Sequence, residues 1–297
     1  MKHNPVLLNE SIDGLNIESG DVIVDGTLGA GGHTLEIIRR FGNKVKIICF
    51  DLDSDAIARA KNLIDKTDGD VIYKNIGFQD IDKALDELSI EKVDGILLDL
   101  GISSFQLEEG DRGFTFLKDE PLLMTMKKSL DDNDITAYDI VNTWEEGTIA
   151  DIIYGFGEER HSRKIAKAIV EARLEKEIKT TFELVGIIDQ AIGKFYKGKK
   201  INPATKTFQA LRIATNSELS NLEQVIQKGF NRLRVGGRMS IISFHSLEDR
   251  IVKQAYVQLK ESGQAKIITK KPIGPSEEEV KLNPRSRSSK LRLLEKL

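Results

Sequence analysis

Short apolar runs and helical patterns alternate along the first hundred residues. The apolar runs predict strands at 21–26, 46–53, 71–76 and 93–100. Between them, apolar residues recur at helical spacing and predict helices at 33–41, 56–64 and 81–88. Strands and helices in strict alternation, with short connections, imply right-handed crossovers and a mostly parallel sheet. This part of the chain therefore predicts a doubly wound α/β fold, in which ligands bind at the carboxyl ends of the strands.

The pattern changes after residue 101. From about 105 to 215 helical spacing is frequent and strand-like alternation is scarce, and Thr180 with Glu183 fits a capping box that opens a helix. Strand signals return only later, at 238–246, 265–271 and 289–297. A helix and a glycine turn at 235–237 precede the first of these strands, and a loop at 272–284 separates the last two. We therefore predict an α/β domain made of residues 1–104 and 216–297, interrupted by an all-helical insertion at 105–215.

The composition of the chain is that of a soluble globular protein. Of its 297 residues, 40% are hydrophobic and 31% are charged, which allows a packed core. No stretch approaches the roughly 18 consecutive apolar residues of a membrane span, and the N-terminus lacks the apolar centre of a secretory signal. The single cysteine, Cys49, lies inside an apolar run and is expected to be a buried strand thiol. These features predict a cytoplasmic protein without membrane contact.

Charge is spread unevenly, although the net charge is only −3. One basic stretch, from Lys194 to Arg212, contains no acidic residue. The C-terminal tail is a second basic segment, with Lys281, Arg285, Arg287, Lys290 and Arg292. Two such segments on an acidic protein are compatible with localised phosphate contacts. From charge alone, a solvated face and a solvated tail are the better interpretation.

A glycine-rich turn between the first strand and the first helix is the strongest local signal. The strand ends at Asp25, and four glycines follow between Gly26 and Gly32. Glycines let the backbone approach a ligand and take positive φ angles, and the helix N-terminus behind them offers unpaired N–H donors. Asp51, at the end of the second strand, stands where a carboxylate that accepts from a ribose diol is expected.

The residues around the glycines distinguish two classes of cofactor. A dinucleotide site needs the pattern G-x-G-x-x-G/A, but after Gly29 and Gly31 the third position is Thr34, so the pattern fails. Methyltransferases commonly place an acid before the glycines, and Asp25 suits a positively charged cofactor better than a pyrophosphate. We therefore favour a nucleoside-type cofactor such as S-adenosylmethionine over a purely structural turn.

A polar cluster follows the fourth strand. Asp99 ends this strand, and Ser103, Ser104 and Gln106 come directly after it. An α/β enzyme places groups that bind its substrate at such a strand end. The alternative is that the two serines only cap the next segment.

Two other catalytic patterns are disfavoured. Ser243, His245 and Asp249 are close in the sequence, but sequence adjacency does not create the geometry of a catalytic triad. The four histidines are too far apart for a local metal motif, so no metal site is predicted. His33 is of more interest as a ring beside the glycine turn.

Over nearly its whole length the sequence resembles one known family. DGTLGAGGHT, DGILLDLGISSFQL, YGFGEERHSRKIAKAIVEAR, PATKTFQALRIATNSEL and GGRMSIISFHSLEDRIVK look like successive blocks of the RsmH (MraW) family, and such blocks run from residue 3 to residue 292. This family consists of bacterial methyltransferases that modify the exocyclic N4 amine of a cytidine in the decoding region of small-subunit (16S) ribosomal RNA. The resemblance implies a Rossmann-like methyltransferase sheet with an inserted helical substrate-recognition domain. It also implies S-adenosylmethionine as the cofactor and the small ribosomal subunit as the partner.

The resemblance further implies roles for individual residues. Seven positions match the cofactor contacts of the family: Gly31, Gly32, His33, Asp51, Phe78, Asp99 and Gln106. Gly31, Gly32 and His33 match the turn that wraps the methionine part of the cofactor. Asp51 matches the acid that contacts the ribose, and Phe78 matches the aromatic residue beside the adenine. Asp99 and Gln106 match the remaining cofactor contacts.

For the reaction itself, we expect positioning to do most of the work, because a sulfonium methyl group is already a strong electrophile. An acceptor for the hydrogens of the cytosine amine would raise its weak nucleophilicity. Our hypothesis gives this catalytic role to Asp99 or to a backbone carbonyl near Ser103. Candidates for contacts to RNA phosphates are Lys199, Lys200, Arg285 and Arg287.

One block departs from the family. After RGFTF the family usually reads close to D-G-P-L-D-M-R-M-D, whereas Leu123 and Thr125 replace an acid and a base here, and Lys127 replaces a second acid. Three alternatives therefore stay open. They are an NAD-type oxidoreductase, which the failed third glycine disfavours, a methyltransferase for DNA or a small molecule, and a non-catalytic RNA-binding assembly factor. The oligomeric state stays open as well, a homodimer included.

Overall fold

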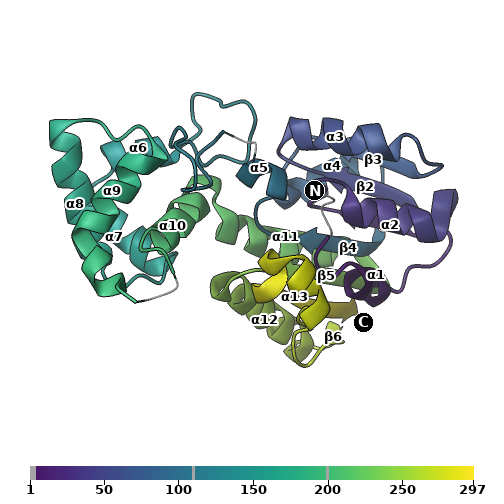
Figure 1. Ribbon diagram of the computed structural model, residues 1–297. Coiled ribbons are helices and arrows are strands. Elements are labelled where there is room, and N and C mark those ends of the chain that lie inside the picture. Colours follow the sequence, from purple (N-terminus) through teal and green to yellow (C-terminus); the bar gives the residue numbers. More distant parts are fainter. Residues whose placement is uncertain (1–4, 109–110, 199–200) are drawn as a thin grey trace. The chain divides into compact units, whose positions relative to one another are not determined.

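The chain divides into two compact units. A computed structural model describes residues 5–108, 111–198 and 201–297. One unit consists of Met1–Gly101 with Leu219–Leu297, and the other of Ile102–Glu218. The first unit contains a sheet flanked by helices, and the second is built mainly from helices (Figure 1). The predicted insertion at 105–215 lies within the second unit.

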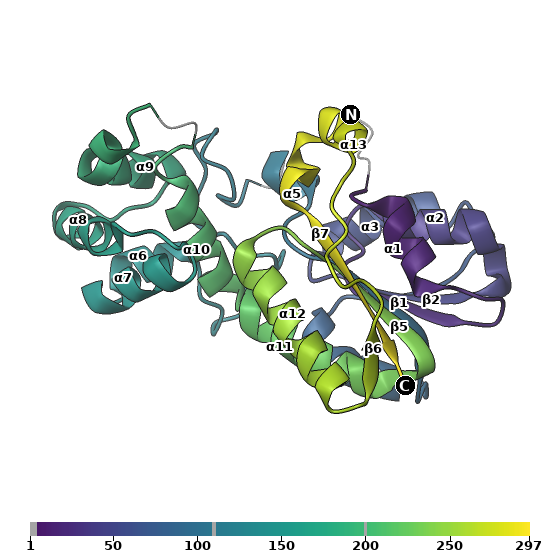
Figure 2. The ribbon, with the colours of Figure 1, turned by 90° about the horizontal axis from the view of Figure 1, so that it is seen from below.

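The first unit is a seven-stranded sheet in the order β3-β2-β1-β4-β5-β7-β6. Its strands are β1 (Val22–Asp25), β2 (Lys46–Phe50), β3 (Asp70–Lys74), β4 (Val93–Asp99), β5 (Leu233–Ser243), β6 (Ala265–Ile267) and β7 (Lys290–Lys296). Strands β1 to β5 pair in parallel, and β7 runs antiparallel to both β5 and β6 (Figure 2). The direction of the strand order reverses between β1 and β4, which is where folds of this kind bind ligands. The predicted doubly wound α/β fold is confirmed.

Helices cover both faces of this sheet. They are α1 (Leu8–Leu15), α2 (Gly32–Phe41), α3 (Ser54–Ile64), α4 (Ile81–Glu87), α11 (Glu218–Arg232), α12 (Ser246–Glu261) and α13 (Glu277–Leu282), with 3-10 turns η1 (Gly42–Lys44), η2 (Phe78–Asp80) and η4 (Pro284–Ser288). Helices α1 to α3 share one core with Ile23 and Ile47, while α4, α11 and α12 share another with Val24 and Ile48. Neighbouring residues of one strand thus face opposite layers, as the period of a strand requires.

Two local predictions in the C-terminal third are wrong. Residues 235–237 belong to β5 instead of forming a turn before it. Because the β4–β5 pairing shifts from Val93↔Leu233 to Gly95↔Arg238, the additional residues of β5 form an irregularity in the ladder. The predicted loop at 272–284 contains helix α13, whose N-cap residue accepts a hydrogen bond in the manner typical of helix starts.

Two other expectations concern the core and the membrane. Cys49 is fully buried in β2, and burial raises the pKa of its thiol, as expected for a strand residue. Within the described ranges, no helix combines the length and the apolar character that crossing a membrane requires.

The second unit packs its helices around a core of its own. They are α5 (Ser104–Glu108), α6 (Ala137–Thr143), α7 (Glu146–Gly155), α8 (Ser162–Glu175), α9 (Thr181–Ile192) and α10 (Thr205–Asn216), with the 3-10 turn η3 (Gly193–Tyr196). The core includes Ile140 of α6, Ile165 of α8 and Leu184 of α9. The predicted capping box of Thr180 and Glu183 opens α9.

Candidate functional site

The glycine-rich turn after β1 lies at the carboxyl edge of the sheet. The backbone N–H of Gly26 donates to the carbonyl of Leu97 in β4 at 2.9 Å, which ties the turn to the neighbouring strand. Gly29 and Gly31 have φ angles of +51° and +79°, in the left-handed region that favours glycine. Gly31 is also the N-cap residue of α2. The turn thus brings the first backbone N–H groups of α2 to the place where the strand order reverses.

Side chains cannot be added to this turn without displacing its neighbours. A Cβ atom on Gly31 would lie 3.1 Å from the Cβ of Ala60, and one on Gly32 would lie 2.2 Å from the Cγ of Pro5. A side chain on Gly32 would force a shift of its neighbours, and one on Gly31 would require a smaller displacement of α3. The turn is therefore a surface of bare backbone, held in place by α3 and by the segment before α1.

Asp25, the acid before the glycines, holds the turn from within. Its side chain is 1% exposed. One carboxylate oxygen accepts from the Thr34 hydroxyl at 2.7 Å and the other from the Thr27 N–H at 3.2 Å. The negative charge of Asp25, which in the sequence favours a cationic cofactor over a pyrophosphate, is thus anchored inside the turn by two hydrogen bonds.

Asp51 closes the other side of the turn. Its Oδ2 accepts from the Gly29 N–H and its Oδ1 from the Asp53 N–H, both at 2.8 Å. Burial raises the pKa of Asp51 to about 6, against the lowering effect of these two bonds. Since each carboxylate oxygen accepts more than one hydrogen bond, Asp51 can also accept from a diol while it holds the turn.

Asp99 ends β4 directly beside the turn. Its backbone N–H donates to the Thr27 hydroxyl at 2.6 Å. Its Oδ2 lies 4.0 Å from Nδ1 of His33, whose Nε2 lies 3.2 Å from the carbonyl oxygen of Val6. Its Oδ1 is buried and has no hydrogen-bond partner among the residues that the structure describes. A buried acceptor without a partner is costly in the free protein, so this atom marks a position for a ligand.

The potential around Asp99 is negative. Burial raises the pKa of Asp99 well above its usual range, and the charges of Asp25, Glu248 and Glu279 raise it further. A negative charge on one of these acids makes the ionisation of its neighbours energetically unfavourable. A bound cation would relieve that penalty, whereas a pyrophosphate would increase it.

Phe78 completes this edge of the sheet. It opens η2 after β3 and is half-buried against the core that contains α4. A Cβ atom on Gly26 would lie 3.3 Å from the Cβ of Phe78, so Phe78 borders the start of the glycine turn. All the predicted cofactor contacts except Gln106 therefore lie in the first unit. They belong to the turn, to the ends of β2 and β4 and to the segment after β3.

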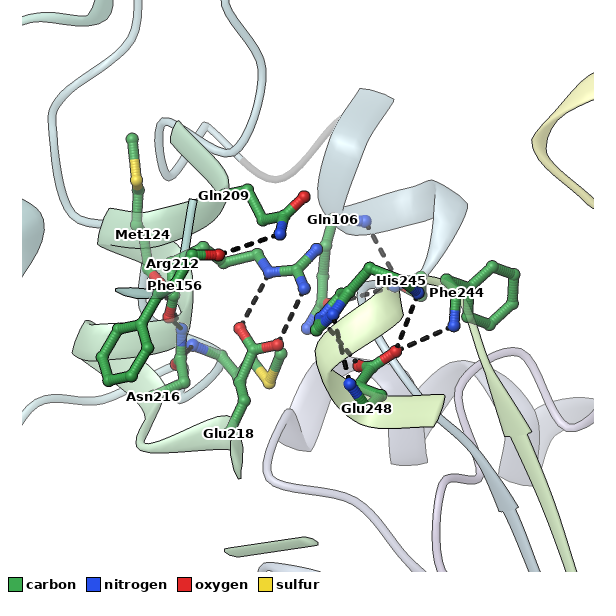
Figure 3. Close-up of polar contacts among 12 residues, drawn as sticks. Gln106, Met124, Phe156, Gln209, Arg212, Asn216, Glu218, Phe244, His245 and Glu248 are labelled. Carbon is green, nitrogen blue, oxygen red and sulfur yellow. Dashed lines mark hydrogen bonds and ion pairs between the residues drawn. The ribbon is translucent and has the colours of Figure 1, made fainter. Parts of the chain in front are cut away.

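A second polar arrangement opens α12, where β5 ends. The carboxylate of Glu248, which is 3% exposed, accepts from the backbone N–H groups of Phe244 at 2.8 Å and His245 at 3.3 Å (Figure 3). The His245 side chain caps the helix in return. The Ser243 hydroxyl donates instead to a backbone carbonyl of β7, and Asp249 pairs with basic side chains of that strand. His245 and Glu248 thus cap α12, whereas Ser243, His245 and Asp249 do not form a catalytic triad.

Comparison with known proteins identifies the family to which these features belong. The model of the MraW methylase family matches residues 1–297. The chain belongs to the MraW methylase family. A relative from Clostridium botulinum (strain Kyoto / Type A2), named Ribosomal RNA small subunit methyltransferase H, is 48% identical over 311 aligned residues, which cover 100% of this chain and 99% of the relative. A relative of the same name from Clostridioides difficile (strain 630) is 44% identical and covers 99% of both chains.

This member of the MraW methylase family is a methyltransferase, and S-adenosylmethionine is its cofactor. The residues present fit that cofactor. The bare backbone of the turn admits a close approach, and the negative potential around Asp99 suits a sulfonium cation. The unpartnered Oδ1 of Asp99 supplies a buried acceptor at the same edge.

The two other predicted site residues of this methyltransferase lie in the second unit, at the start of α5. The Ser103 N–H donates to Oε1 of Gln106 at 3.0 Å, and the Gln106 N–H donates to the Ser103 hydroxyl at 3.2 Å. The Ser103 carbonyl accepts from the Leu107 N–H at 3.2 Å. Ser103 thus takes part in a cap at the start of α5, which is one of the two roles that the sequence allowed. Because its hydroxyl and its carbonyl both serve the cap, Asp99 is the stronger candidate for the catalytic acceptor.

The block that departs from the MraW pattern is part of the fold of the second unit. Thr125 is 6% exposed and Leu123 is half-buried. The Asn216 side chain, at the end of α10, donates to the Met124 carbonyl between them at 2.7 Å (Figure 3). Lys127 pairs with an aspartate of the same loop at 2.6 Å. Since an acid and a base are absent together at partly buried positions, the change leaves no unpaired charge there.

The basic residues of the C-terminal tail divide into two groups. Arg285 and Arg287 are exposed in η4. Lys290 and Arg292, by contrast, pair with Asp249 of α12 at 3.1 and 2.7 Å. The second pair holds β7 to α12.

The basic stretch from residue 194 to 212 divides in the same way. Arg212 pairs with Glu218 through two hydrogen bonds of 2.8 Å (Figure 3). Lys206 donates to a backbone carbonyl at 2.7 Å. Lys199 and Lys200, the two predicted RNA contacts in this stretch, lie outside the residues that the structure describes.

Two acids near Asp99 were not predicted from the sequence. Glu248 belongs to a capping box whose N-cap residue is His245, so the usual Ser/Thr pattern does not reveal it. Glu279 follows Ser276 in an S-x-x-E pattern that signals a helix start, and that signal was available in the sequence. Its carboxylate accepts from the Leu7 N–H at 2.8 Å, a contact that only the tertiary structure reveals.

Proposed function

We propose that this enzyme methylates the exocyclic N4 amine of a cytidine in the decoding region of small-subunit (16S) ribosomal RNA. The relatives that match over their full length, at 44% to 48% identity, carry the name of a small-subunit ribosomal RNA methyltransferase. Within the structure, the observation that carries the proposal is the buried, unpartnered Oδ1 of Asp99 beside the glycine turn. It is an acceptor of the kind that an amine donor requires.

In this proposal, each cofactor contact has a part of S-adenosylmethionine to hold. Gly31 and Gly32 face the methionine part with bare backbone, and His33 stands beside them. Asp51 accepts from the ribose hydroxyls, because a carboxylate next to the turn suits a diol. Phe78 offers its ring to the adenine. Gln106 and Asp99 complete the proposed set: Gly31, Gly32, His33, Asp51, Phe78, Asp99 and Gln106.

Asp99 is the proposed catalytic acceptor. When bound, S-adenosylmethionine supplies an electrophilic methyl group on a sulfonium centre. Oδ1 of Asp99 accepts a hydrogen of the cytosine amine, which opposes the delocalisation of the nitrogen lone pair into the ring. As the nitrogen–carbon bond forms and the sulfur–carbon bond breaks, the nitrogen becomes positively charged, and its proton passes to Asp99 or to water. His33, 4.0 Å from the other carboxylate oxygen, limits the orientations that Asp99 can take.

The helical unit is the proposed substrate-recognition part, and the small ribosomal subunit in the cytoplasm is the proposed partner. The target cytidine must leave its stack to reach an acceptor at the edge of the sheet, which costs about a few kcal/mol. Contacts to the surrounding phosphates offset that cost. Arg285 and Arg287 are exposed and are proposed for such contacts, and Lys199 and Lys200 stay in the proposal on sequence grounds. Light scattering in solution will decide between a monomer and a homodimer.

The test is the transfer of labelled methyl groups from S-adenosylmethionine to small subunits that lack the modification. Naked 16S ribosomal RNA and duplex DNA serve as parallel substrates. Nuclease digestion then identifies the labelled nucleoside. We expect the label in N4-methylated cytidine from the subunits.

Label in another nucleoside or in DNA would refute the assignment of the substrate. If no label is transferred while calorimetry shows intact cofactor binding, the protein is an RNA-binding assembly factor instead. In that event attention turns to Leu123, Thr125 and Lys127, where the chain departs from the family.

A further inference from the structure

Two basic segments of the helical unit are joined by a pair of stacked rings. The ring of His161, just before α8, lies 4.3 Å from the ring of Phe195 in η3, at an angle of 19°. The Nζ atoms of Lys164 and Lys194 lie 4.6 Å and 5.2 Å from the centroid of the Phe195 ring. The fold thus gathers two ammonium groups from separate segments around one aromatic ring, which stabilises both of them.

A buried acid holds the two segments that carry these rings. Glu159, which is 2% exposed, accepts from the His161 N–H at 2.8 Å and from the hydroxyl of Tyr196 in η3. Both segments are therefore bound to one carboxylate in the interior. The buried acid positions the rings, and within the described residues it forms no ion pair with the cations at the surface.

The cations on this surface have no acidic partner among the residues that the structure describes. They are exposed and comprise Arg160, Arg163, Lys164, Lys194 and Lys197. Further along α8 the situation differs, because Lys167 pairs with Glu171 and Lys176 with Glu183. The unpaired charge is thus concentrated at one end of the helix.

That end of α8 is the unfavourable one for cations. Arg163 and Lys164 lie in the first turn of this 14-residue helix, and that first turn contains no acid. The helix dipole favours negative charge at its N-terminus, so two cations there oppose it. Repulsion among the neighbouring cations adds to this cost. A polyanion bound to the surface would relieve both, and it would gain from the release of its own counterions.

We propose that the α8–η3 surface binds phosphates of the RNA substrate. This surface consists of the cations Arg160, Arg163, Lys164 and Lys194 and the rings of His161 and Phe195. The proposal rests on the proposed function, because it names the part of the helical unit that holds the RNA. Phe195 and His161 position the cations, and the lysines and arginines contact the backbone of the RNA. Such contacts carry no base preference, so they set affinity and placement and leave the choice of base to other residues.

The test compares Lys164→Glu and Lys194→Glu with Lys66→Glu as the matched control. Lys66 is an exposed lysine that follows α3, at the amino edge of the sheet and away from the glycine turn. Small subunits that lack the modification are the probe, and filter binding is measured between 50 and 200 mM salt. We expect each surface variant to bind roughly 5- to 10-fold more weakly at low salt. The slope of log affinity against log salt should fall by about 0.7 to 0.9 for each lost phosphate contact.

A conservative variant tests the role of the ring. Phe195→Leu keeps the apolar volume but removes the stacking partner and the quadrupole that holds the ammonium groups. It should weaken binding about 2- to 5-fold while the salt slope changes little, because the lysines remain. Affinity for S-adenosylmethionine should be unchanged in all of these variants, which shows that they fold.

If both lysine variants bind the subunits with wild-type affinity and salt slope, the proposal that the α8–η3 surface binds the RNA is wrong. This outcome is distinct from failure of the proposed function. If the wild-type protein methylates cytidine in the subunits, the function stands even when the surface variants bind normally. An equal loss of binding in Lys66→Glu would also contradict the proposal, since it would show a general effect of charge.

Discussion

At the scale of single residues, three carboxylates at strand ends have three different environments. Asp25 is turned into the protein and bonds within the glycine turn. Asp51 accepts hydrogen bonds from the turn and can also accept from a ligand beside it. Its pKa is about 6. Asp99 keeps one buried oxygen without a partner. In the proposed function the same type of side chain therefore has three roles, as a scaffold in Asp25, as the acceptor for a diol in Asp51 and as the acceptor for the reaction in Asp99.

Replacing Asp99 by asparagine tests the catalytic acceptor. In Asp99→Asn the amide can present its NH2 group where the carboxylate accepted, and it cannot take up a proton. We expect kcat for methyl transfer to fall by about 100-fold, the lower end of what a positioned acid or base contributes. Affinity for S-adenosylmethionine should fall by less than tenfold, because the backbone of the turn is unchanged. An unchanged kcat under single-turnover conditions would disprove the role of Asp99.

The raised pKa of Asp51 predicts a pH dependence of cofactor binding. The ionised carboxylate accepts more strongly from ribose hydroxyls than the protonated group does. With a pKa of about 6, Asp51 is largely ionised at pH 7.5 and largely protonated at pH 5. Affinity should therefore be highest above pH 7 and should decline as the pH falls through 6.

Calorimetric titration of S-adenosylmethionine between pH 5 and 8 checks this prediction. The matched variant is Asp51→Asn, which should bind more weakly at pH 7.5, with a shallower dependence on pH. A profile of the variant that parallels the wild-type profile would assign the titration to another group, such as Asp99.

At the scale of elements, the glycine turn combines a conformational and a packing requirement. Gly31 has a φ angle of +79°, and the space beside it is occupied by Ala60 and Ile64 of α3. Gly263, after α12, has a similar φ angle of +73° with nothing within 4 Å. The two glycines therefore share the backbone conformation and differ in their surroundings.

Alanine at these two positions separates the requirements. Both Gly31→Ala and Gly263→Ala should lose roughly 1–2 kcal/mol of unfolding free energy, because alanine is strained in the left-handed region. Only Gly31→Ala must also move α3 or the turn, so only this variant should raise the Kd for S-adenosylmethionine, by about tenfold or more. Equal cofactor affinity in the two variants would mean that the packing against α3 does not set the shape of the site.

At the scale of the whole molecule, each unit has its own core, and contacts far apart in the chain complete the first one. The Leu7 N–H donates to Glu279 across 272 positions of the sequence. Arg292 of β7 pairs with Asp249 of α12 at 2.7 Å. Through these contacts the C-terminal segment becomes part of the sheet and of the charge environment around Asp99, although its composition is that of a basic tail.

Local patterns determined much of the fold and the location of the site. The strand–helix alternation, the glycine turn after β1 and the position of Asp51 at the end of β2 were all predictable. Each depends on the periodicity of a short segment or on residue types that a turn demands. The helical character of the insertion was predictable for the same reason.

Only the tertiary structure decided which polar groups are free and which are already bound. Asp25 is engaged within its turn, Lys290 and Arg292 are paired with Asp249, and Oδ1 of Asp99 is left without a partner. The charges around Asp99 could not be predicted from the sequence either, because Glu248 and Glu279 come from the distant C-terminal part of the chain. Sequence patterns report propensities over a few residues, whereas hydrogen-bond partners and electric fields depend on distances in space that the packing of the sheet creates.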